Sequence, residues 1–124
     1  MPLRHRVLIA EDDDMLRRMY RLELEVAGFD VQEARNGLDA LYRIDNDPPD
    51  AVLLDIEMPL VNGVVVRQDI AAHAATRPIP VIVVTGSAES FDWLDVACVL
   101  KKPVPEGALV HALTKCLPSN PRIQ

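Results

Sequence analysis

Short apolar runs alternate with amphipathic stretches along the whole chain of 124 residues. The alternation predicts strands that each lead into a helix, which is the pattern of a parallel sheet covered by helices on both faces. Several apolar runs are almost continuous in valine, isoleucine, leucine and alanine, as is typical of strands buried on both faces. The chain is therefore expected to form a doubly wound α/β fold. The expected strands are His5–Ala10, Phe29–Ala34, Ala51–Asp55, Ile79–Thr85 and Ala97–Lys101.

The first amphipathic stretch predicts a helix over about Asp14–Ala27. Aspartates precede its first turn, where side-chain oxygens can accept hydrogen bonds from free backbone N–H groups, and Gly28 follows its last turn. The apolar residues recur at the spacing of one helical face. This apolar stripe consists of Met15, Met19, Leu22 and Val26.

Three further helices are expected after this one. They are Gly37–Ile44, with Leu38, Leu41 and Ile44 facing inward; Val64–Ala75; and a last helix that has Pro105 in its first turn and carries Leu109, Ala112, Leu113 and Cys116 on its apolar side. The segment Ser87–Asp95 is too short for a long crossover helix, so we expect one or two turns there. The tail Pro118–Gln124 is short, polar and rich in proline, which predicts disorder.

The size and composition predict one soluble domain over residues 1–124. A chain of this length is typical of a single domain, and 49% of its residues are hydrophobic. The formal charge of −6 disfavours direct nucleic-acid binding, which usually requires clustered Lys and Arg. Neither a signal peptide nor a long apolar run is visible, so we expect a cytoplasmic protein without membrane insertion.

The cysteines and histidines give no sign of a metal site. Cys98 and Cys116 have no paired spacing and fall on apolar positions, so they are interpreted as core thiols. His5, His73 and His111 are scattered, and none has the spacing of a metal ligand. Structural roles are expected for all of them.

Polar residues end four of the expected strands. Glu11 and Asp12 follow the first, Asp55 ends the third, Thr85 ends the fourth, and Lys101-Lys102 end the fifth. In a doubly wound sheet, ligands bind outside the carboxyl ends of the strands. We therefore expect three carboxylates, a hydroxyl and an ammonium group to converge at one edge of the sheet.

Three carboxylates about 5 Å apart repel one another by about 3 kcal/mol per pair at an effective dielectric constant of 20. This repulsion favours a bound cation, and oxygen-only ligands favour Mg²⁺ or Mn²⁺. A cation that keeps vacant positions can share phosphate oxygens with an aspartate nucleophile. The alternative is that the acidic residues only cap the helix that follows. We accept that role for Asp13 and Asp14, but not for Glu11 and Asp12, because the strand-end Asp55 lies beside them.

On these residues the chain resembles the receiver domain of bacterial two-component response regulators over nearly its whole length. The resemblance implies a flavodoxin-like, five-stranded parallel sheet with strand order 2-1-3-4-5. The segments that carry it are Val7–Asp13, Ala34–Leu41, Asp50–Pro59 with Gly63, Val84–Gly86 and Lys102-Pro103.

The resemblance also implies a role for each acidic residue of the site. Asp55 matches the aspartate that is phosphorylated in the family. Glu11 and Asp12 match the acidic pair that organises Mg²⁺ together with Asp55 and the backbone carbonyl of Glu57, and Mn²⁺ is an accepted substitute.

Thr85 matches the switch hydroxyl that moves toward the phosphoryl group, and Lys102 matches the lysine that pairs with it. Adjacent strand residues point to opposite faces, so only one of Lys101 and Lys102 can reach the site. Glu57 and Ser87 match positions that tune how fast the acyl phosphate hydrolyses.

Two departures from the family pattern fall in the second half of the chain. Lys102 follows Thr85 by seventeen positions, several fewer than is usual, which predicts a shortened fourth helix. Val99 stands where the family normally has Tyr or Phe. Phe91 and Trp93 lie in the shortened segment, and two interpretations stay open for them: packing over the sheet in place of the lost helix, or an exposed anchor for a partner.

The expected function is a phosphoacceptor switch rather than an enzyme. It receives its phosphoryl group from a phosphohistidine on a sensor histidine kinase or phosphotransfer protein, and it signals to a downstream protein through protein–protein contacts, with homodimer formation through the last helix as a further option. Two alternatives stay open. The first is a phosphatase of the haloacid dehalogenase type, a family that has a second aspartate at the position where this chain has Glu57. The second is a receiver-shaped interaction module that is never phosphorylated.

Overall fold

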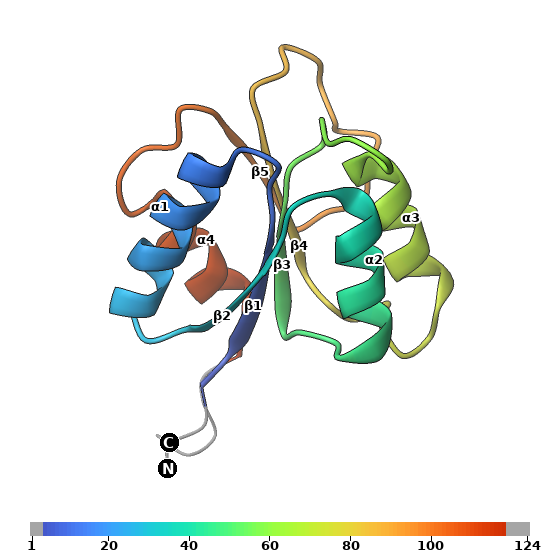
Figure 1. Cartoon of the computed structure of the whole chain (residues 1–124), viewed down its shortest axis with the longest axis horizontal. Helices are drawn as coiled ribbons and strands as arrows, with labels where there is room; N and C mark the ends of the chain where they lie inside the picture. The colour runs from blue at the N-terminus through green and yellow to red at the C-terminus, as the bar shows by residue number, and fades with distance from the viewer. Residues whose placement is uncertain (1–3, 119–124) are drawn as a thin grey trace.

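The computed structural model describes residues 4–118 as a five-stranded parallel sheet with the order β2-β1-β3-β4-β5. Helices α1 and α4 cover one face, and α2 and α3 cover the other (Figure 1). The predicted fold class and strand order are confirmed. The elements are β1 (Arg6–Ala10), α1 (Asp14–Val26), β2 (Asp30–Ala34), α2 (Gly37–Asn46), β3 (Ala51–Leu54), α3 (Gly63–Ala72), β4 (Val81–Thr85), β5 (Cys98–Lys101) and α4 (Ala108–Cys116).

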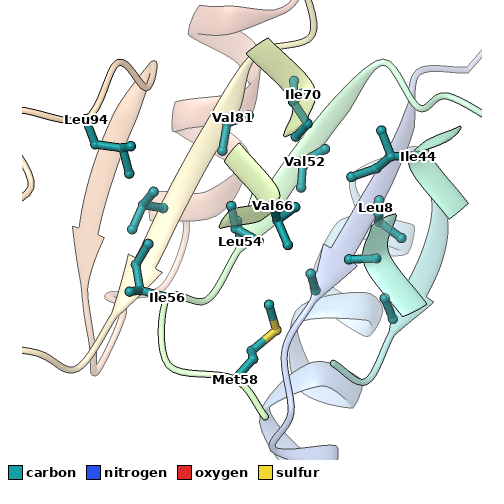
Figure 2. Packing of buried hydrophobic residues seen from close by; sticks show 14 of the residues in the cluster. Leu8, Ile44, Val52, Leu54, Ile56, Met58, Val66, Ile70, Val81 and Leu94 are labelled. Atoms are coloured by element: carbon teal, nitrogen blue, oxygen red, sulfur yellow. The ribbon is translucent and has the colours of Figure 1, made fainter. Parts of the chain in front are cut away.

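The core has two layers because the central strands are apolar on both faces. Figure 2 shows the layer under α2 and α3, where Leu8, Val52 and Leu54 of the sheet pack near Ile44 of α2 and Val66 of α3. The second layer packs α1 and α4 against the opposite face. Its fully buried members include Val7, Ile9, Leu24, Ile82, Leu109 and Leu113.

Element boundaries differ from the predicted ones by a few residues. The last helix begins at Ala108 rather than in the turn at Pro105, because Gly107 has a φ of 83°, which is outside the helical region. Helix α3 ends at Ala72, and Thr76 then donates its hydroxyl hydrogen bond to the Ile70 carbonyl at 2.8 Å. The predicted disorder of the tail concerns residues 119–124, which lie outside the described part, together with the described Pro118.

The apolar stripe predicted on α1 does not face the sheet. Met15, Met19, Leu22 and Val26 are 57–89% exposed, whereas the buried face of α1 consists of Arg17, Tyr20 and Leu24. This orientation of α1 is favoured by Arg17, whose guanidinium donates to Glu33 of β2 and to the Glu11 backbone carbonyl after β1. The inward position predicted for Leu38 on α2 is also wrong. That side chain is exposed, whereas Ile44 is buried and Leu41 partly buried, as predicted, and Ala40 is buried as well.

The segment 86–97, fully described, contains no helix between β4 and β5. Its one local backbone turn is closed by the Leu94 N–H, which donates to the Phe91 carbonyl at 2.9 Å. Phe91 is 4% exposed and packs in the layer under α2 and α3, while Trp93 is 66% exposed. Phe91 therefore takes the place of the missing helix, whereas Trp93 remains at the surface.

The described residues agree with the structural roles predicted for the cysteines. Cys98 and Cys116 are free thiols, partly buried against the layer under α1 and α4, and burial raises the pKa of Cys116. A raised pKa keeps the thiol protonated and unreactive. Within residues 4–118, no helix is both long enough and apolar enough to cross a membrane.

Candidate functional site at the carboxyl edge of the sheet

The carboxyl ends of β1 and β3 place three carboxylates side by side. These strands are neighbours, with Ala10 opposite Leu54, so the residues that follow them share one edge. One oxygen from each of Glu11, Asp12 and Asp55 lies within 4.8 Å of the other two. Glu11 is 2% and Asp55 4% exposed, whereas Asp12 is exposed. The structure thus brings together the three predicted carboxylates.

These groups open into a pocket of about 370 Å³. Its lining includes the residues that follow β1 and β3 and the lysine predicted for the site. The lining residues are Glu11, Asp12, Asp13, Leu16, Asp55, Glu57, Gly86 and Lys102. The pocket is open to solvent and large enough to admit a phosphoryl group.

Among residues 4–118, Lys102 is the only basic residue that lines this pocket. Its Nζ lies 2.7 Å from Glu11 Oε1 and 3.6 Å from Asp55 Oδ2. Burial, followed by the charge of Glu11, raises the pKa of Asp55 to about 7, although Lys102 acts in the opposite direction. Burial by itself would lower the pKa of Lys102, but contact with the two carboxylates leaves it raised. One ammonium group therefore does not compensate all the negative charge of the pocket.

The donor set fits a hard divalent cation. Glu11 Oε1 is buried, and the Lys102 ammonium group is the one cationic group that contacts it among residues 4–118. All the side-chain donors are carboxylate oxygens, the ligands that Mg²⁺ prefers. Glu57 lies at the rim of the pocket, where its backbone N–H donates to Asp55 Oδ1 at 3.3 Å.

Arg17 is a positioning residue that the sequence reasoning missed. Its guanidinium donates to the Glu11 backbone carbonyl at 2.9 Å, to Glu33 at 3.0 Å and to Asp14 at 2.6 Å. These bonds fix the main chain at the start of the acidic pair. The available signal was the helical spacing of Arg17 with Tyr20 and Leu24, opposite an acidic residue in β2.

The N-terminal end of α3 packs against the chain that follows Asp55. A Cβ atom at Gly63 would lie 2.8 Å from the Ile56 Cα atom and would collide with the Asp55 carbonyl. The Gly63 N–H also donates to the Ile56 carbonyl at 2.8 Å. Gly63 is therefore needed to keep the main chain beside Asp55 in place.

Thr85 and Lys101 serve the loop between β4 and β5. Thr85 is fully buried, and its Oγ1 accepts a hydrogen bond from the Ser87 N–H at 3.0 Å, so it does not line the pocket. The Lys101 Nζ donates to the carbonyls of Ser87 and Glu89 at 2.8 and 2.9 Å and lies 5.8 Å from the centre of the Phe91 ring. Of the two neighbouring lysines, Lys102 lines the pocket, whereas Lys101 holds the loop between β4 and β5.

Comparison with known proteins identifies the family. A family model described as the response regulator receiver domain matches residues 7–114. The chain is 36% identical over 86 residues to the polar-differentiation response regulator DivK of Brucella anthropi. This match covers 69% of the chain and 70% of DivK. The chain is also 40% identical over 86 residues to protein-glutamate methylesterase/protein-glutamine glutaminase 3 of Rhodospirillum rubrum. That match covers 68% of the chain.

Solved structures share the fold over nearly the whole chain. A sensor protein from Polaromonas sp. JS666 superposes with a TM-score of 0.84 at 28% identity, covering 92% of this chain and 96% of that one. The chemotaxis response regulator CheY4 of Vibrio cholerae superposes with a TM-score of 0.85 at 22% identity, covering 93% and 100%.

The chain belongs to the response regulator receiver domain family and is a phosphoacceptor switch of two-component signalling. Receiver domains generally bind Mg²⁺ at an acidic pocket and interact with histidine kinases or phosphotransfer proteins. The family is largely non-catalytic. The match spans 22% of the methylesterase, so the likeness to that enzyme concerns its receiver region alone.

Proposed function

We propose that Asp55 accepts the phosphoryl group in a pocket where Glu11, Asp12 and Asp55 hold Mg²⁺ together with the backbone carbonyl of Glu57. The observation that carries this proposal is the buried Asp55 carboxylate, with Lys102 Nζ 3.6 Å away and two further carboxylates within 4.8 Å. Mn²⁺ is a chemically similar substitute. When bound, the cation supplies positive charge that offsets the charge of the carboxylates and of the incoming phosphoryl oxygens.

The proposed transfer joins an Asp55 carboxylate oxygen to phosphorus as the bond from phosphorus to the donor's imidazole nitrogen breaks. The histidine takes the bonding electron pair, and Asp55 becomes an acyl phosphate. Attack requires the ionised carboxylate, and the ammonium group of Lys102 favours that form. The same ammonium group is near enough to pair with a phosphoryl oxygen on the product.

The switch is proposed to act through Thr85 and the loop between β4 and β5. Thr85 Oγ1 accepts a hydrogen bond from the Ser87 N–H, and a phosphoryl oxygen on Asp55 would accept a hydrogen bond from the Thr85 hydroxyl once that side chain turns toward it. Movement of the Thr85 hydroxyl would break its hydrogen bond with the Ser87 N–H. The Ser87 carbonyl accepts a hydrogen bond from Lys101 Nζ, so the change would reach the loop that Lys101 contacts. Phosphorylation would thereby shift the population of loop conformations, and the exposed Trp93 would present the change to a protein partner.

The proposed donor is a phosphohistidine on a sensor histidine kinase or phosphotransfer protein in the cytoplasm. A donor must cover the mouth of the pocket to reach Asp55. Met15 lies between Asp13 and Leu16, which line that mouth, and its side chain is 73% exposed. The exposed stripe of α1 therefore supplies apolar surface where a donor would bind. We further propose that residues 1–124 act as one receiver domain without steady catalytic turnover.

Intact-protein mass spectrometry tests the acceptor. The chain is incubated with Mg²⁺ and a small phosphodonor, and wild type is compared with Asp55→Asn and with Asp30→Asn, a control at an exposed position at the start of β2. A gain of one phosphoryl mass is expected in wild type and in the control only. Label on Asp55→Asn would refute the assignment. If all three stay unlabelled with a cognate kinase as well, the chain is a phosphorylation-independent interaction module.

A further inference from the structure

A second group of metal-ligand side chains lies far from the phosphoacceptor pocket. Helices α2 and α3 run opposite to the strands, so their C-terminal ends lie at the other edge of the sheet (Figure 1). Asp45 is near the end of α2, Asp69 is in the last turns of α3, and His73 directly follows α3. One ligand atom from each of the three lies within 4.8 Å of the others. Sequence spacing did not predict this group, because it depends on the packing of two helices.

The two carboxylates face each other without a lysine or arginine between them. In the described part of the chain, the only ion-pair contact to either is made by His73, whose Nδ1 lies 3.7 Å from Asp69 Oδ1. Asp69 Oδ2 is buried and has no hydrogen-bond partner among these residues. The negative ends of the two helix dipoles add to the same unfavourable charge, which a cation would relieve.

His73 is arranged as a nitrogen ligand. Its Nδ1 lies 2.9 Å from the backbone carbonyl of Asp69, one turn earlier. The tautomer with hydrogen on Nδ1 donates to that carbonyl, so the lone pair of Nε2 is free. A hydrogen bond from the other ring nitrogen to a carbonyl is the usual arrangement that orients a metal-bound histidine.

We propose that Asp45, Asp69 and His73 form a second metal site, specific for a transition-metal cation with the ligand preferences of Zn²⁺. One imidazole and two carboxylates suit Zn²⁺, whereas Mg²⁺ prefers oxygen ligands alone. Bonds of about 2.0–2.2 Å in a tetrahedral site require ligand atoms roughly 3.3 Å apart. Asp45 is exposed, so a change of its side-chain rotamer would bring its carboxylate closer to Asp69 and leave the hydrogen bond of His73 Nδ1 in place. Water completes the coordination.

A metal ion bound by these three residues would link the C-terminal ends of α2 and α3. Calorimetric titration of the whole chain with Zn²⁺, in excess Mg²⁺ to fill the oxygen-only pocket, tests the site. One Zn²⁺ per chain is expected. His73→Gln and Asp69→Asn should each weaken binding by about tenfold or more, since each removes a ligand. His111→Gln, an exposed histidine on α4, is the matched control and should bind as wild type does.

Two further measurements test the Zn²⁺ site independently of the proposed phosphorylation of Asp55. Asp55→Asn should lose phosphorylation and retain Zn²⁺ binding. Co²⁺ should give visible absorption bands with wild type that His73→Gln lacks, and Mn²⁺ should bind more weakly than Zn²⁺. The proposal is overturned if no Zn²⁺ binds in the presence of Mg²⁺, or if His111→Gln weakens binding as much as His73→Gln. Loss of Zn²⁺ binding in Asp55→Asn would also overturn it.

Discussion

Replacing Asp55 by asparagine should stabilise the fold at alkaline pH when no divalent cation is present. The Asp55 carboxyl has a pKa of about 7 in the folded chain, against about 3.9 for an unperturbed aspartate. The folded state therefore binds more protons than the unfolded state between these two values. Stability falls as the pH rises from about 4 to about 7, because the carboxyl must ionise inside the pocket.

The size of the change in the free energy of unfolding follows from the difference between the pKa of Asp55 in the folded chain and in the unfolded chain. Full ionisation corresponds to about 4 kcal/mol, which is an upper limit because side chains and water can relax around the charge. We expect Asp55→Asn to be more stable than wild type by about 2–4 kcal/mol at pH 8 and nearly equal to it at pH 4. Carboxylates whose pKa is lowered, such as Asp14 and Glu33, are present in both proteins and cancel in the comparison.

Urea unfolding followed by circular dichroism, at several pH values in a chelator, measures this difference. Adding Mg²⁺ at pH 8 should stabilise wild type and narrow the gap, because a cation in the pocket offsets the ionised carboxylate. Asp30→Asn serves as the control for replacing an exposed aspartate. The reasoning is refuted if Asp55→Asn is no more stable than wild type at pH 8, or if the difference between them does not change with pH.

Four other substitutions test contacts in the core and in the loop between β4 and β5. Phe91→Ala should lower the free energy of unfolding by about 3–5 kcal/mol, whereas Trp93→Ala should change it by less than about 0.5 kcal/mol; equal effects in urea unfolding would contradict their different burial. Lys101→Met should speed amide hydrogen exchange in the loop between β4 and β5, and unchanged exchange would show that the Lys101 contacts are unimportant. Gly37→Ala should cost about 3 kcal/mol or more in urea unfolding, because its Cβ would collide with the Val61 carbonyl, and wild-type stability would disprove that contact.

The strands and the acidic pocket were predictable from the sequence because they depend on local patterns. Continuous apolar runs indicate strands buried on both faces, and residues at the ends of parallel strands must share one edge. The sequence thus predicts that Glu11, Asp55 and Lys102 lie at one edge of the sheet, and in the structure all three line the same pocket.

The rotation of α1 was not predictable from apolar spacing. That rule assumes that a helix buries its most apolar face, but α1 buries Arg17 with partners from β2 and from the end of β1. The contacts made by Lys101 and the group around His73 were missed for a related reason. Each depends on which segments pack against one another in three dimensions, and this information is absent from spacing along the chain.

The ion pair between Glu11 and Lys102 joins residues that are 91 positions apart in the chain. Lys102 follows β5, which is synthesised after the other four strands of the sheet and, in the described part of the chain, pairs with β4 alone. During synthesis the acidic residues are therefore exposed long before their ammonium partner exists. An incomplete chain has the carboxylates but no assembled pocket, so the proposed phosphorylation would require a complete sheet.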